Sequence, residues 1–67
     1  MEDEPIYLDG WPEQQGWFDC LIDGTEPDRL RHWICPIAGR HHWVSIDNQY
    51  VEALHNIAYT GEATAYP

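Results

Sequence analysis

The sequence predicts a small α+β domain, in which a three-stranded antiparallel β-meander packs against one C-terminal helix and follows an extended acidic N-terminal arm. Three observations lead to this fold. The chain has 67 residues, which is enough for one domain with a thin core. Residues 17–46 contain short runs that alternate or are rich in β-branched and aromatic residues. Residues 47–61 change to the apolar spacing of a helix.

The predicted arm covers residues 1–16. Its prolines and glycines, such as Pro5 and Gly10, prevent a long helix, and at most Ile6–Leu8 can add a short edge strand. Two large aromatic residues of the arm, Tyr7 and Trp11, lie among acidic and polar neighbours. We expect them either to fold back onto the domain or to face a partner.

The predicted domain spans residues 17–61 and begins with the strand "WFDCLID". This segment alternates, so that Phe18, Cys20 and Ile22 point to one side, which we assign to the core. The following "DGTEPD" is rich in turn-forming residues and is predicted to be a loop.

The stretch "RLRHWICPIAGRHHWVSID" predicts a hairpin with a two-residue turn at "AG". In this register Trp33 pairs with Val44 and Cys35 pairs with His42, and their face stacks beside the first strand in the core. Pro36 has no N–H to donate, so we expect a bulge or an early end to the pairing there. The opposite face is predicted to be half-exposed and carries His32, Ile34, Pro36, His41, Trp43 and Ser45.

The segment "DNQYVEALHNIAYTG" predicts the helix. One helical face collects its apolar residues, which are Tyr50, Val51, Leu54, Ile57 and Ala58. Asp47 or Asn48 can cap its start and Gly61 can end it. Residues 62–67 are predicted to be a frayed tail.

Charge is the most unusual property of the composition. The formal net charge is −9, and residues 1–28 hold nine acidic residues and no basic one. Such a field repels nucleic acid and anionic lipid and speeds encounter with basic surfaces, so we expect no direct nucleic-acid binding. The alternative is that the acidity only keeps a small, tryptophan-rich protein in solution.

The location of the protein is predicted to be cytoplasmic. No segment approaches the roughly 20 apolar residues of a membrane span, and the start "MEDEP" is acidic where a secretory signal would be basic. In the cytosol Cys20 and Cys35 should be reduced.

Metal binding and catalysis are the weaker interpretations. His32, Cys35, His41 and His42, with Cys20 across the sheet, are the ligand types of zinc, but their spacing does not match the usual zinc motifs. Cys20, Cys35 and His42 share a predicted face and are the weak metal candidates, one ligand short of a closed site. A Cys35–His42 nucleophile lacks a third group and an oxyanion hole, so we expect no cofactor and no enzymatic activity.

Partner binding is favoured by the four tryptophans, because this residue is enriched at interface hot spots. In the predicted register Trp17 and Trp43 lie on the face away from the helix, where they form an exposed aromatic patch. A partner would cover that patch, and the alternatives are that the N-terminal arm or a second copy of the chain covers it. The predicted partner-binding residues are Trp11, Trp17, Asp19, Asp23, Glu26, Asp28, His41 and Trp43.

In length, lack of lysine, acidic N-terminal half and the compact meander "GWFDCLIDG…RHWICPIAGRHHWVSID", the chain resembles the small acidic proteins that phages and prophages encode. These proteins include anti-CRISPR proteins, DNA mimics and inhibitors of host enzymes. The resemblance implies an inhibitor that acts by binding. Together with the acidic charge, it favours a non-enzymatic protein of the host cytoplasm that blocks a basic surface, such as a nucleic-acid-binding one, of a host protein or defence complex. The alternative is a small self-associating or structural zinc-binding domain.

Overall fold

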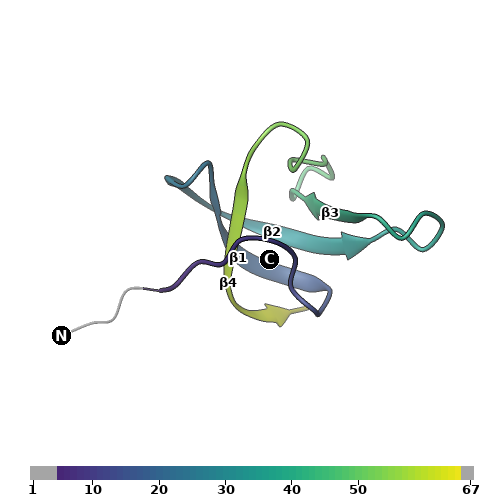
Figure 1. Ribbon diagram of the computed structural model, residues 1–67, viewed down its shortest axis with the longest axis horizontal. Coiled ribbons are helices and arrows are strands. Elements are labelled where there is room, and N and C mark those ends of the chain that lie inside the picture. Colours follow the sequence, from purple (N-terminus) through teal and green to yellow (C-terminus); the bar gives the residue numbers. More distant parts are fainter. Residues whose placement is uncertain (1–4, 66–67) are drawn as a thin grey trace.

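A computed structural model describes residues 5–65 and contains a single antiparallel sheet of four strands (Figure 1). The strands are β1 (Gly16–Ile22), β2 (Glu26–Ile34), β3 (His41–Val44) and β4 (Ile57–Thr64), and they lie in the order β3-β2-β1-β4. The predicted antiparallel sheet is confirmed. The predicted α+β class and three-stranded meander are wrong, because a fourth strand pairs with β1 and residues 5–65 include no helix.

The predicted helix is replaced by a loop and β4. Asn48 has a φ of 67°, a left-handed conformation that a right-handed helix cannot contain. One helical turn forms, in which the N–H of His55 donates to the carbonyl of Val51 (3.1 Å). Beyond it, the β-branched and aromatic run from Ile57 pairs with β1, and its alternation decides the structure. The described residues contain no helix long and apolar enough to span a membrane.

A tight turn at Asp23 and Gly24 joins β1 to β2. Both residues have positive φ values, 54° and 78°, which suits an Asp-Gly pair in a hairpin turn. The turn pairs Ile22 with Glu26, so β2 begins in a segment that was predicted to be a loop.

The connection between β2 and β3 is longer than the predicted two-residue turn. β2 ends at Ile34, the early end of pairing that Pro36 led us to expect. The loop is closed by hydrogen bonds from the Cys35 N–H to the Arg40 carbonyl (2.8 Å) and from the Gly39 N–H to the Cys35 carbonyl (2.7 Å). The register therefore shifts by two residues, and His42 takes the place opposite Trp33 that was predicted for Val44.

The core lies on the face of β2 and β3 opposite to the predicted one. The predicted core positions Phe18 and Cys20 are buried, but Leu30 and His32 accompany them instead of Trp33. The turn explains the difference, because pairing Ile22 with Glu26 places the even-numbered residues of β2 beside Phe18. The buried residues of the sheet are Phe18, Cys20, Leu30, His32, Trp43 and Val44.

The arm folds back over the core face of the sheet (Figure 1). Leu8 exchanges two backbone hydrogen bonds with Tyr59 (2.8 and 3.0 Å), which adds a one-residue bridge at the outer edge of β4. Pro12 is buried. At the other end of the chain residues 62–64 belong to β4, where a frayed tail was predicted.

Candidate functional site

Trp11 covers the aromatic part of the core. Its ring stacks on His32, His41 and Trp43, with centroid distances of 5.5, 5.1 and 5.6 Å. Trp11 remains 39% exposed, whereas Trp43 is 1% exposed. The exposed aromatic patch predicted around Trp43 is therefore absent, and Trp43 has a core position under the arm.

His32 is fully buried and joins three segments of the chain. Its Nδ1 lies 2.7 Å from the Gln14 carbonyl oxygen, and its Nε2 lies 2.8 Å from Nδ1 of His41. A carbonyl can only accept, so Nδ1 of His32 carries the proton and Nε2 of neutral His32 accepts from His41. Burial lowers the pKa of His32, and the nearby His41 lowers it further, while the Gln14 carbonyl opposes both effects.

A second aromatic group lies on the opposite face of the sheet. His42 stacks on Trp33 (5.7 Å) and on Tyr50 (4.0 Å), and Trp33 and Tyr50 also stack on each other (6.3 Å). The Glu52 carboxylate links His42 to the backbone of β3. One of its oxygens lies 2.8 Å from Nδ1 of His42, and the other accepts from the N–H of Trp43 (3.0 Å). The hydrogen bond of His42 to Glu52 thus serves a structural arrangement.

Trp17 and Asp19 lie on this same opposite face. Trp17 is half-buried and pairs with Arg31 across β1 and β2. Asp19 is exposed and forms an ion pair with Arg29 (3.1 Å), which also contacts the Thr64 hydroxyl. An exposed ion pair of this kind contributes little to stability.

The β1–β2 hairpin carries the acidic residues predicted to contact a partner. Asp23, Glu26 and Asp28 are all exposed. The Asp23 carboxylate accepts from the N–H of Asn56 (2.9 Å) and lies 2.8 Å from Nδ1 of His55. These two hydrogen bonds, the backbone one first, lower the pKa of Asp23 and keep it ionised.

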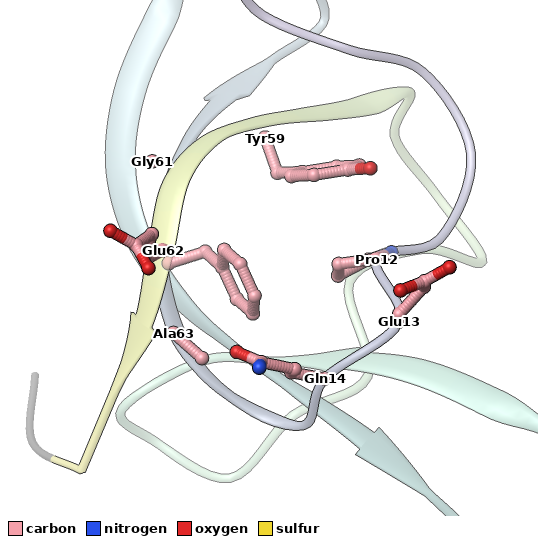
Figure 2. Close-up of a pocket in the computed structure, with 8 residues that line it drawn as sticks. Pro12, Glu13, Gln14, Tyr59, Gly61, Glu62 and Ala63 are labelled. Carbon is pink, nitrogen blue, oxygen red and sulfur yellow. The ribbon is translucent and has the colours of Figure 1, made fainter.

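An open pocket of about 290 Å³ lies between the arm and β4 (Figure 2). Pro12, Gln14 and Tyr59 point into it from the two sides. The carboxylates of Glu13 and Glu62 lie on opposite sides of its opening. The lining residues are Pro12, Glu13, Gln14, Phe18, Tyr59, Gly61, Glu62 and Ala63.

A bulge in β4 shapes this pocket. Asp19 pairs with Thr60 and Trp17 with Thr64, so β4 uses four residues where β1 uses two. Gly61 begins the bulge with a φ of 81°. Gly16 lets β4 return close to β1, because a Cβ there would lie 2.9 Å from the Thr64 carbonyl oxygen.

The three weak metal candidates are dispersed. Cys20 is buried in the core, Cys35 begins the β2–β3 loop and His42 lies on the opposite face from Cys20. Burial raises the pKa of the Cys20 thiol to about 12, whereas the N–H groups of Ala38 and Ile37 lower the pKa of Cys35. Among residues 5–65 no three His, Cys, Asp or Glu side chains are placed to hold a metal ion.

The predicted site residues therefore separate into groups. Trp11, His41 and buried Trp43 meet where the arm covers the core, whereas Trp17 and Asp19 lie on the opposite face. The pocket residues Glu13, Gln14, Phe18, Tyr59 and Glu62 were not predicted as a site. No local motif signals them, since they meet only because the arm folds back beside the β4 bulge.

No family model, curated protein or solved structure matches the chain.

Proposed function

We propose that the protein is a non-enzymatic binding module that occupies a basic surface of another protein and thereby blocks nucleic-acid binding there. The observation that supports the proposal most directly is the exposure of its carboxylates. Eight acidic residues in the described part of the chain are exposed: Asp9, Glu13, Asp19, Asp23, Glu26, Asp28, Asp47 and Glu62. Carboxylates on a folded domain can take the places that a basic protein gives to phosphates.

The contact face of this module is the core side of the sheet, beyond the part that the arm covers. Cys20 pairs with Asp28 on one side and with Tyr59 on the other, so these three side chains share a face. Glu26 lies on the same face, two residues from Asp28 along β2. A partner seated here meets both the acidic hairpin and the pocket.

The test is a capture experiment followed by kinetics. The tagged full chain is used to isolate a binding protein at low salt, and the association rate with that protein is measured as salt increases. We expect a partner with a basic surface, an association rate that falls with salt, and displacement of a fluorescent oligonucleotide from the partner. Binding that is independent of salt, or that leaves the oligonucleotide in place, would contradict the proposal.

Two charge variants separate a local contact from net charge. The double substitution Glu26→Gln with Asp28→Asn removes two carboxylates from the hairpin, and Asp9→Asn with Asp47→Asn removes two elsewhere. Both keep the side-chain shapes and change the net charge equally. We expect the hairpin variant to bind about tenfold more weakly and the second variant to change the affinity less. Equal losses would show that only the overall charge matters.

A second copy of the chain is the competing partner. The face opposite the core presents half-buried Trp17, Leu21 and Trp33, which a homodimer could cover. Sedimentation of the free protein tests this alternative directly, because a homodimer has twice the mass of the single chain in the absence of any partner.

A further inference from the structure

The charged residues that line the pocket between the arm and β4 are all acidic. Two of its eight lining residues are glutamates and none is basic. Glu13 comes from the arm and Glu62 from the bulge in β4, and their carboxylates lie at the outer rim on the two sides of the other lining side chains (Figure 2). Two carboxylates at the rim and no basic lining residue give this pocket a negative potential, which attracts cations and repels anions.

Aromatic rings supply the apolar part of the same pocket. Phe18 and Tyr59 meet edge to face, with their centroids 5.6 Å apart and their planes at 75°. Tyr59 is half-buried, so part of its ring is available to a ligand. Ring faces attract cations through their quadrupole, and arginine is the residue most often found on them.

We propose that this pocket binds one arginine side chain of a protein partner. The inference rests on the proposed function and gives that function a specific anchor. A planar guanidinium can stack on an aromatic ring while its N–H groups donate to a carboxylate, which an ammonium group does less well. The volume of about 290 Å³ fits a single side chain, since pockets for drug-sized ligands are mostly larger.

Position links the pocket to the acidic hairpin. Tyr59 and Asp28 flank Cys20 on one face of the sheet, as neighbours of the same central strand. A partner segment that places its arginine in the pocket therefore brings its adjacent basic residues toward Asp28 and Glu26. The pocket fixes the position of the partner segment on the sheet, and the charge of the hairpin raises the association rate.

The test uses the isotope-labelled full chain and three short peptides, acetyl-Gly-Xaa-Gly-amide with arginine, lysine or citrulline at Xaa. Citrulline has nearly the shape of arginine without its charge. We expect the arginine peptide to cause saturable amide shifts at Gln14, Tyr59, Gly61 and Ala63, the lysine peptide to bind more weakly, and citrulline to cause no saturable shift. Shifts spread over all acidic residues, or equal binding of citrulline, would overturn the inference.

Glu13→Gln supplies the matched variant, with Asp47→Asn as the control of equal charge on an exposed residue outside the pocket. We expect Glu13→Gln to weaken the arginine peptide about two- to fivefold and Asp47→Asn to leave it unchanged. Equal effects of the two variants would overturn the proposal that the arginine peptide binds in this pocket.

The captured partner separates this inference from the proposed function. If the Glu13→Gln variant binds the partner as tightly as the wild type, the pocket is wrong as an anchor and the function stands. If the arginine peptide binds in the pocket and no basic partner is captured, the function is wrong and the cation site stands.

Discussion

Nε2 of His32 lies 2.8 Å from Nδ1 of His41, and the two imidazole rings meet edge to edge with 7° between their planes. The carbonyl of Gln14 extends this pair, so one chain of hydrogen bonds connects the arm, β2 and β3. A proton added at Nε2 of His32 would place a positive charge on a fully buried ring, and His41 would have to move its own proton from Nδ1 to Nε2 in order to accept from it. Neutral His32 is therefore the state that the buried network accommodates.

The stability of the fold should depend on the protonation of His32. Burial lowers the pKa of His32 in the folded protein, so the unfolded chain binds this proton more readily. The free energy of unfolding should be level above pH about 6.5 and fall as the pH decreases below that value. Urea unfolding at a series of pH values between about 5 and 8 measures the slope.

The control for this prediction is a second histidine. His32→Gln keeps a side chain that can donate to Gln14 and should flatten the slope. His55→Gln replaces an exposed histidine and should leave the slope caused by His32 in place. Retention of the full slope in His32→Gln would place its origin in another group.

Removal of the Trp11 side chain should loosen the arm. Trp11 contacts three rings but is 39% exposed, so Trp11→Ala should lower the free energy of unfolding by about 2 kcal/mol, less than for a fully buried tryptophan. Ile37→Ala is the control, because Ile37 is 95% exposed and its loss should change stability by at most about 0.5 kcal/mol. Hydrogen exchange should show faster opening at Leu8 and Tyr59 in the Trp11 variant.

The same variant tests the arm in a second way. Trp11→Ala uncovers His32, which should shift the pKa of His32 back toward its ordinary value. An unchanged stability together with an unchanged pH slope would contradict the assigned role of Trp11 as a cover of the core.

The sequence predicts the positions of the strands better than it predicts which face of each strand packs into the core. Alternation at Phe18, Cys20 and Ile22 correctly marks the core side of β1, because a half-buried strand must alternate. The number of residues in the turn between β1 and β2 determines which face of β2 packs into the core. The Asp23-Gly24 pair carries that information, since it is a hairpin signal, but it was interpreted as part of a longer loop.

The helix was predicted wrongly because two periods overlap in one segment. Val51, Leu54 and Ile57 recur at helical spacing, while Ile57 and Tyr59 also alternate as a strand does. Pairing with the free edge of β1 decides between them, and this is a tertiary interaction that a local pattern does not contain. The pocket was missed for a related reason, because Glu13 and Glu62 are 49 residues apart in the sequence.

The two cysteines should differ strongly in reactivity. Cys20 is 1% exposed and burial raises its pKa to about 12, so little thiolate forms at neutral pH. Cys35 is half-buried, and backbone N–H groups in its loop lower its pKa. Iodoacetamide followed by mass spectrometry should show rapid modification of Cys35 and protection of Cys20 until the protein is unfolded.

The control is the unfolded chain, in which the two thiols should react at similar rates. Rapid labelling of Cys20 in the folded protein at the rate of Cys35 would show that the core opens far more often than its packing implies.

The Glu52 carboxylate should contribute to stability through two hydrogen bonds. It accepts from the backbone N–H of buried Trp43 and from Nδ1 of His42. Glu52→Ala leaves the Trp43 N–H without its partner, and we expect a loss of about 2 kcal/mol. Glu52→Gln keeps one oxygen that can accept from Trp43, so its loss should be about half as large.

Asp47→Ala is the control, because it removes an exposed carboxylate from the same loop and should have almost no effect. Chemical unfolding of the three variants should rank them in this order, and the ring protons of His42 and Tyr50 should shift in the two Glu52 variants alone, because only there does the stacked imidazole lose the carboxylate that orients it.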